Sequence, residues 1–338
     1  MNKKKSDYAI VCSCNPGYGF GMISSMNAQN YFGTDADWEI ACTTPEAGDE
    51  VGFTKEYRDK VSNAFPFNVS WTPIQELMKT VVDRRTGGGI LERFWLAYWL
   101  LAYKLLKEKK YKAVCVIQAD TFIFTNLDLY FQLADSGYLV CSEHPAGKIR
   151  VEDMPYGDDK AIYDRSMCGI FDSVNFIGQK YAQLPGDIVE YQCEDAFKRE
   201  SNHSVITLNR AVCKYGSKKT VIGLDGNLWA GDSIWGDGVL VRVLDDRIYN
   251  HAKIQIRAWH CRWWQKGRVF GEWANNKQRI LDNKDNAEFL KIFDIHDANY
   301  TVVRDFMVKF NDMTPEIKSE EYAKGSLIRP KWELGEDD

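Results

Sequence analysis

The stretch Lys112–Phe131, KAVCVIQADTFIFTNLDLYF, decides the fold that this sequence predicts. It begins with a short apolar run, Ala113 to Ile117, which is typical of a strand buried on both faces of a sheet. The run ends at Gln118-Ala119-Asp120, so an acid follows the carboxyl end of the strand. Open α/β sheets bind their ligands at that edge. An aspartate there can hold a hard cation, which can neutralise a diphosphate, although a strand end with a solvated Asp reads the same way.

The segments before this stretch predict the opening of a nucleotide-binding α/β unit. A strand is expected over Tyr8 to Cys12, a helix over Met22 to Tyr31, and a second strand over Trp38 to Thr43. The loop Ser13 to Gly19 lacks the G-x-G-x-x-G spacing of dinucleotide-binding proteins, so no NAD site is expected there.

The remaining pattern predicts an α/β fold, with a mainly parallel, twisted sheet flanked by helices. Apolar residues at helical spacing from Phe94 to Leu105 indicate a helix with a core face. Five further strands are expected, over Tyr138–Cys141, Ser166–Ile170, Val174–Ile177, Ser204–Leu208 and Val239–Leu244. We expect one domain over residues 1–274, with a first half at 1–146 and a second at 147–274. Residues 275–338 are expected to form a helical extension with an acidic tail.

Composition narrows the class of protein. The chain has 338 residues and a net charge of -5, so the protein as a whole is not expected to bind polyanions. Its nine cysteines are scattered without a C-x-x-C pair, which is typical of a reduced, intracellular protein. The basic N-terminus is followed by too short an apolar run for a signal peptide, and charges interrupt the run Ile90 to Leu106. We therefore expect a cytoplasmic protein without a membrane span.

Two motifs carry a resemblance to a known family. Gln118-Ala119-Asp120 resembles the Asp-X-Asp region of glycosyltransferases with the GT-A fold, with Gln118 in place of the first Asp. His260 and Lys266, six positions apart, resemble the His and Lys of the His-X-X-Gly-X-X-Lys-Pro-Trp element found in the glycogenin and lipopolysaccharide galactosyltransferase type. The Gly of that element is Trp263 here, and Pro-Trp is Gly267-Arg268. The resemblance extends from Tyr8 to Arg268.

The resemblance implies a nucleotide-sugar donor, most simply a UDP-sugar, and a divalent metal. Asp120 and His260 would hold Mn²⁺ or Mg²⁺, with His251 as a reserve ligand. Lys266 would contact the diphosphate as a point charge. Gln118 would hydrogen-bond a ribose hydroxyl in place of the missing first Asp.

The same resemblance assigns further donor contacts. Arg93 would help to hold the sugar-nucleotide, and Arg84 and Arg85 are rivals for that role. The base would be lined by residues at the ends of the first two strands: Cys12, Ser13, Cys14 and Thr43.

The pair Glu194-Asp195 is the candidate for acceptor chemistry. We expect it at the start of a helix, where the helix dipole alone would favour two acids. The pair also resembles the Glu-Asp element by which many GT-A enzymes bind the acceptor or supply a base, and a carboxylate there can take a proton from an acceptor hydroxyl. Which of the two would act stays open.

The sequence thus predicts a metal-assisted hexosyl- or pentosyltransferase, with its donor half at 1–146 and its acceptor half at 147–274. The acceptor stays open among a glycan, a protein and a modified DNA base. Basic residues between Lys253 and Arg268 alternate with Trp259, Trp263, Trp264 and Trp273, a composition that also suits DNA. The stereochemistry and oligomeric state stay open.

Two alternatives belong to other classes. A non-catalytic carbohydrate- or DNA-binding protein could keep the same fold, since Gln118 weakens the metal motif. A sugar nucleotidyltransferase is disfavoured, because Asn15 to Gly19 lacks the basic residue that its glycine-rich signature carries.

Overall fold

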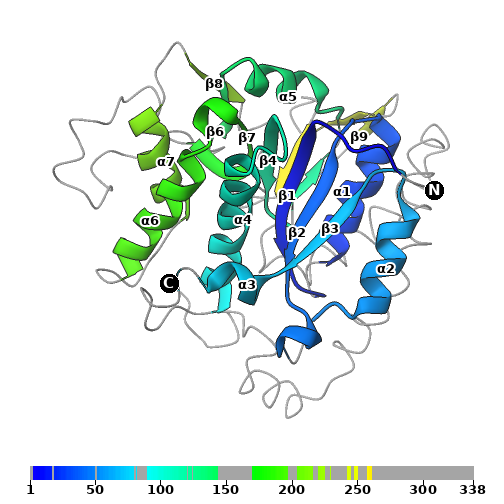
Figure 1. The fold of residues 1–338 in the computed structure, drawn as a ribbon. Coiled ribbons are helices and arrows are strands. Elements are labelled where there is room, and N and C mark those ends of the chain that lie inside the picture. Colours follow the sequence, from blue (N-terminus) through cyan, green and yellow to red (C-terminus); the bar gives the residue numbers. More distant parts are fainter. Residues whose placement is uncertain are drawn as a thin grey trace.

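The computed structural model describes residues 3–16, 19–49, 52–79, 81, 90–119, 121–123, 125–143, 170–196, 204–215, 220–224, 229, 242–244, 247–249 and 257–260. Within these residues a seven-stranded sheet with the order β3-β2-β1-β4-β7-β6-β8 forms the centre, and helices cover both of its faces (Figure 1). Its strands are β1 (Tyr8–Cys14), β2 (Asp37–Cys42), β3 (Val69–Pro73), β4 (Ala113–Ile117), β6 (Leu139–Glu143), β7 (Ile170–Gly178) and β8 (Val221–Leu224).

The helices and the small strands complete the description. The helices are α1 (Gly19–Phe32), α2 (Lys55–Ala64), α3 (Ile74–Met78), α4 (Ile90–Lys107), α5 (Asp128–Asp135), α6 (Leu184–Ala196) and α7 (Ser204–Tyr215). Two small antiparallel pairs are formed by β5 (Thr121–Ile123) with β11 (Ala258–His260), and by β9 (Arg242–Leu244) with β10 (Arg247–Tyr249).

The sheet is mainly parallel, which confirms the predicted fold class. β1 pairs in parallel with β2 and β4, β2 with β3, and β6 with β8. Only β7 runs the other way, because it is antiparallel to both β4 and β6. Six of the seven strands therefore present their carboxyl ends at one edge of the sheet.

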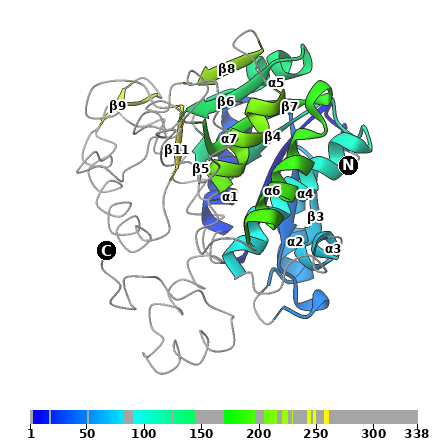
Figure 2. The ribbon, with the colours of Figure 1, turned by 90° about the vertical axis from the view of Figure 1, so that its left-hand side faces the viewer.

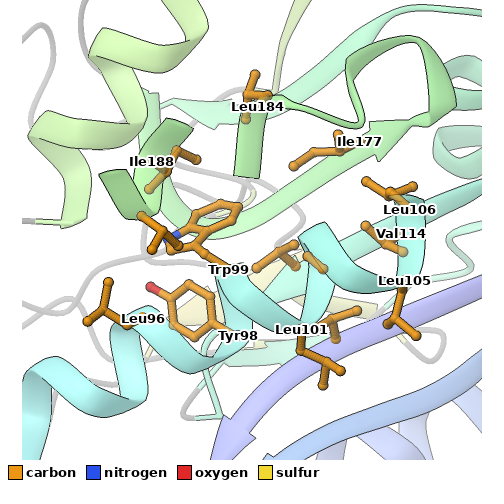
Figure 3. Close-up of a cluster of buried hydrophobic side chains, with 14 of the residues drawn as sticks. Leu96, Tyr98, Trp99, Leu101, Leu105, Leu106, Val114, Ile177, Leu184 and Ile188 are labelled. Atoms are coloured by element: carbon orange, nitrogen blue, oxygen red, sulfur yellow. The ribbon is translucent and has the colours of Figure 1, made fainter. Parts of the chain in front are cut away.

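Each face of the sheet has its own apolar core, because alternate residues of a strand point to opposite faces. Ala9 and Val11 of β1 pack on the face covered by α4, α6 and α7, whereas Ile10 and Cys12 pack on the face covered by α1, α2 and α5. Figure 3 shows the first core, in which Trp99 of α4 lies against Ile188 of α6. The second contains the fully buried Trp38.

Several predicted elements are confirmed, and one is wrong. β4 covers Ala113–Ile117 as predicted, and the apolar helix before it is α4. The strand expected over Ser204–Leu208 is instead the first part of helix α7. The buried side chains Thr207, Leu208, Ala211 and Val212 recur at helical spacing and pack α7 against β7 and α6. Of the strand expected over Ser166–Ile170, residues 166–169 lie outside the described residues, and Ile170 begins β7.

The described part of the chain contains no helix that is both long and apolar enough to span a membrane.

Helix α4 ends in a hydrogen-bonded cap with an unusual residue. The Lys109 amide donates to the carbonyl of Leu106, and the Lys110 amide donates to that of Leu105, both at 3.0 Å. This is the Schellman pattern, whose left-handed position is usually occupied by Gly. Here that position is Lys109, with a φ of 52°. A side chain in this conformation clashes with its own backbone, so the cap is formed at some cost in free energy.

We predict that Lys109→Gly raises the free energy of unfolding by about 1 kcal/mol, because glycine adopts this conformation without the clash. Chemical denaturation measures the change. As a control, Lys107→Gly in the last helical turn is expected to lower the same quantity by about 1 kcal/mol. A lower stability of Lys109→Gly would contradict the analysis.

The two helices on the β7 side, α6 and α7, are joined by a buried carboxylate. Asp187 of α6 accepts a hydrogen bond from the Tyr215 hydroxyl at 2.6 Å, another from the Gln183 amide at 3.2 Å, and an ion pair from Lys214. Burial acts to raise the pKa of this carboxyl, but the three hydrogen bonds outweigh it and lower the pKa below its ordinary value.

Because the pKa of Asp187 is lower in the folded than in the unfolded chain, its ionised form adds stability at neutral pH, and this contribution is lost as the pH falls. We predict that Asp187→Asn lowers the free energy of unfolding by about 1–3 kcal/mol at pH 7. The gap between wild type and variant should close below pH of about 4. Denaturant titrations across pH test this, with Glu190→Gln, exposed on the same helix, as the control.

Candidate functional site

At the carboxyl edge of the sheet, the order in which strands are added reverses between β1 and β4. From β1 the chain proceeds to β2 and β3 on one side, and then crosses back along α4 to β4 on the other side. Crevices at such switch points are the usual ligand sites of open α/β sheets. The edge brings together predicted residues from three segments: Cys12, Ser13 and Cys14 of β1, Thr43 after β2, and Gln118 after β4.

The β5–β11 pair joins a distant segment to this edge. The Thr121 amide donates to the Gln118 carbonyl at 3.0 Å, so the chain turns directly after β4 and enters β5. β5 lies beside β11 (Figure 2), and their antiparallel register sets His260 opposite Thr121. Asp120, the chain neighbour of Thr121, lies outside the described residues, and nothing is described of the His260 side chain. The backbone nevertheless brings the two predicted metal-binding segments side by side.

Buried hydrogen bonds fix the position of β5 and β11. The Ser25 hydroxyl of α1 donates to the Thr121 carbonyl at 2.6 Å. The Thr121 hydroxyl donates to the Ser173 carbonyl of β7 at 3.5 Å. At the start of β11, the Arg257 guanidinium donates to the Thr125 hydroxyl at 3.1 Å. The short pair is therefore held to both α1 and the central sheet.

Polar groups without hydrogen-bond partners gather at the end of β2. Among the described residues, the hydroxyls of Thr43, Thr44 and Tyr57 are buried and have no partner. Burial raises the pKa of Tyr57, with a smaller effect of the nearby Cys14 thiol, so the phenol is uncharged at neutral pH. An unmade buried hydrogen bond costs about 1–3 kcal/mol, which a ligand with polar groups can recover. The sequence pointed to Thr43 through the strand end, but it gave no signal for Tyr57.

The buried Cys thiols at this edge are unreactive at neutral pH. Burial raises the pKa of Cys42 to about 12, and it raises that of Cys12 further. Both thiols stay protonated and act as small apolar side chains rather than as nucleophiles or metal ligands. Cys12 and Cys14 are fully buried, so neither residue offers an exposed surface to a base in this structure.

Arg93 lies in the first turns of α4, at the same edge. The carbonyl of its neighbour Phe94 accepts a hydrogen bond from the Ser13 hydroxyl at 2.7 Å, which ties this part of α4 to β1. The Arg93 side chain and all of Lys266 lie outside what the structure describes.

Glu194 and Asp195 are placed differently from the prediction. They lie in the last turn of α6 and not at a helix start, so the helix dipole disfavours their charge instead of stabilising it. β7 ends at Gly178 beside the start of β4, and α6 runs back from there. Its last turn therefore lies towards the carboxyl edge. Nothing is described of the two side chains themselves.

No group of three or more His, Cys, Asp or Glu side chains that could hold a metal occurs among the described residues. Asp120 is not among them, and the His260 imidazole is not described.

Comparison with known proteins gives likenesses of fold. No family model matches the chain, and no curated protein matches it. A galactosyltransferase, LgtC, solved with donor and acceptor sugar analogues, matches at 12% identity and a TM-score of 0.40, over 67% of this chain and 76% of that one. Mouse xyloside xylosyltransferase 1 matches at 10% identity and a TM-score of 0.45, over 77% and 98%. WbbM, a bifunctional glycosyltransferase, matches at 12% and 0.42, over 69% and 41%.

These names agree with the resemblance to GT-A glycosyltransferases that the sequence predicts. At such identities and scores the likeness concerns the arrangement of strands and helices alone, so the functional argument is made from the residues of this chain.

We predict that Ser25→Ala loosens the β5–β11 pair, because it removes the hydroxyl that donates to the Thr121 carbonyl. The lost bond costs about 1 kcal/mol, and amide hydrogen exchange in β5 and β11 should accelerate correspondingly. Ser6→Ala is the matched control, since its hydroxyl donates to the Asp35 carbonyl at 2.8 Å at the other end of the sheet. Equal acceleration in both variants would contradict a local role for Ser25.

Proposed function

We propose that this chain is a glycosyltransferase that moves a hexosyl or pentosyl group from a UDP-sugar to an acceptor hydroxyl. The observation that carries the proposal is the β5–β11 register, which sets His260 opposite Thr121. Thr121 directly follows Asp120 in the chain. Paired Cα atoms of antiparallel strands are about 4.5–5.5 Å apart, and consecutive Cα atoms about 3.8 Å. A carboxylate at 120 and an imidazole at 260 are thus within reach of one ion.

The residues at this edge suit a hard divalent ion, Mn²⁺ or Mg²⁺. One carboxylate and one imidazole make a partial ligand set, which diphosphate oxygens and water can complete. When bound, the ion neutralises charge on the leaving diphosphate. Lys266 adds a point charge to the same diphosphate, and Arg93 holds the sugar-nucleotide.

The donor lies in this proposal across the ends of β1, β2 and β4. Ser13 and Thr43 line the base, and the buried Cys12 and Cys14 lie on either side of Ser13 in β1. The unpartnered hydroxyls beside Thr43 support a polar ligand there. Gln118 is only partly buried, and its side-chain amide can hydrogen-bond a ribose hydroxyl. Residues 1–146 form the donor half.

The acceptor half is residues 147–274. Glu194 or Asp195 takes the proton from the acceptor hydroxyl. A carboxylate at a helix carboxyl end is a stronger base than one at a helix start, because the dipole there disfavours its charge. The acceptor stays open among a glycan, a protein and a modified DNA base, since the basic and Trp-rich segment 253–273 is described only over 257–260.

The test is donor hydrolysis by the purified full-length chain. UDP-, GDP- and dTDP-sugars are incubated with Mn²⁺ or with EDTA, and free nucleotide is measured. We predict metal-dependent release from one UDP-sugar. Asp120→Asn and His260→Ala should each reduce it by roughly 100-fold, the scale of a lost electrostatic contact to a transition state.

His251→Ala is the matched control and should keep full hydrolysis. If His251→Ala fails while His260→Ala is active, His251 is the ligand and the assignment from the register is wrong. Release of no nucleotide from any donor, together with no nucleotide binding in calorimetry, would leave the alternative of a binding protein on this fold.

A further inference from the structure

The fold brings two distant basic runs of the sequence together at the amino end of the sheet. β1 and β4 pair from Tyr8 and Ala113 onward, so the residues before each strand are neighbours. The Lys5 ammonium donates to the Lys110 carbonyl at 2.9 Å. The resulting surface, here called the basic corner, consists of Lys3, Lys4, Lys5, Lys107, Lys109, Lys110 and Lys112.

The charge of the basic corner is opposite in sign to that of the chain. Its two runs contain seven lysines, and five carboxylates lie among or beside them: Asp7, Asp37, Glu39, Glu108 and Asp135. Asp37 and Glu39 are buried, and Glu39 is paired with Lys110 at 2.6 Å. The corner is therefore positive, whereas the whole chain carries a net charge of -5. One acid of α5, Asp135, also lies near Lys112 and offsets part of its charge.

Two tyrosine rings contact three of the lysine side chains. The Lys5 and Lys110 ammonium groups lie 5.1 and 5.5 Å from the Tyr111 ring, and that of Lys107 lies 5.6 Å from the Tyr103 ring. The Tyr111 hydroxyl in turn donates to Glu39 at 2.7 Å. These contacts orient the cations without neutralising most of them.

Lys109 gives a second, independent indication. It occupies the left-handed cap position that glycine would fill at lower cost. A strained residue that is retained on a surface suggests a role for its side chain. At this position the side chain adds an exposed cation to the corner.

We propose that the basic corner docks the protein on a lipid bilayer that contains anionic headgroups. All seven cations are lysines, which act as hydrated point charges and suit a fluid, unstructured layer of negative charge. Clusters of four to eight such residues are the usual electrostatic signature of lipid binding. Nucleic acid is a poorer fit, because Tyr111 is only 3% exposed and offers no ring face on which a base can stack.

The position of the corner fits this role. It lies at the amino ends of the parallel strands, and the candidate site lies at their carboxyl ends (Figure 1). A protein bound through the basic corner would keep the site facing away from the membrane and open to solvent. The proposal does not depend on the glycosyltransferase assignment, and its test uses no donor.

Vesicle co-sedimentation of the full-length chain tests the proposal. The probes are vesicles of phosphatidylcholine alone and vesicles of equal parts phosphatidylcholine and phosphatidylserine. We expect binding to the anionic vesicles only, and its loss at about 1 M salt, where the Debye length falls to about 3 Å. Lys107→Gln with Lys109→Gln should weaken binding on the order of tenfold.

The matched control is Lys55→Gln with Lys79→Gln, two exposed lysines elsewhere on the surface, which changes the net charge equally and should leave binding intact. Lys109→Gly separates docking from folding, because it should raise the unfolding midpoint and yet weaken vesicle binding. Absence of binding to anionic vesicles, equal binding to neutral ones, or an equal loss in the control pair would overturn the proposal. Binding to a labelled DNA duplex instead of vesicles would overturn it in favour of nucleic acid.

Discussion

The parallel pairing of β1 with β4 is the constraint on which the rest of the molecule depends. β1 is hydrogen-bonded to β2 on its other side, so its pairing with β4 can form only if the chain crosses back over the sheet. α4 makes that crossing with 18 residues, about 27 Å at 1.5 Å per residue, the full height of the sheet. Packed against β1, β4 and α6, it contributes more buried residues to one core than any other element. The switch point lies at the carboxyl end of the β1–β4 pair, and the basic corner lies at its amino end.

The β5–β11 pair depends on that pairing in turn. Only three residues separate β5 from Ile117, the last residue of β4, so the position of β4 determines where β5 starts. The Ser25 and Thr121 hydrogen bonds then fix it to α1 and β7. Two strands of three residues each are marginal by themselves. Their position therefore comes from buried side-chain contacts, and the segment containing His260 is held near the switch point for the same reason.

The sequence predicted the elements whose signal is local. β4 follows from five consecutive apolar residues, and α4 from apolar spacing over several turns. α7 was mispredicted because Val205, Ile206 and Thr207 are β-branched and read as a strand, whereas packing on β7 and α6 selects the helix. The placement of Glu194-Asp195 failed because the segment that begins α6, with the buried Leu184, Ile188 and Val189, was not recognised as a helix start.

A local sequence pattern does not predict contacts between segments that are far apart in the chain. The residues of either segment alone predict neither the register of His260 with Thr121 nor the contact of Lys5 with Lys110. From the net charge of -5, the protein as a whole was not expected to bind polyanions. That inference applies to the chain as a whole, but folding concentrates cations that the sequence keeps about a hundred residues apart, and electrostatic attraction acts on the local field.

Gln118 determines how the proposed site differs from one with two acids. The Gln118 backbone carbonyl is already committed to the turn that starts β5, so the residue is structural whatever its side chain does. An amide carries no charge, so in the proposed site this motif offers the cation one carboxylate, that of Asp120, instead of two. In the proposed site Lys266 and Arg93 also contact the donor, where their two positive charges would outweigh the single charge of Asp120. In this proposal the diphosphate would supply much of the negative charge that retains the ion, so we expect metal and donor to bind together rather than metal first.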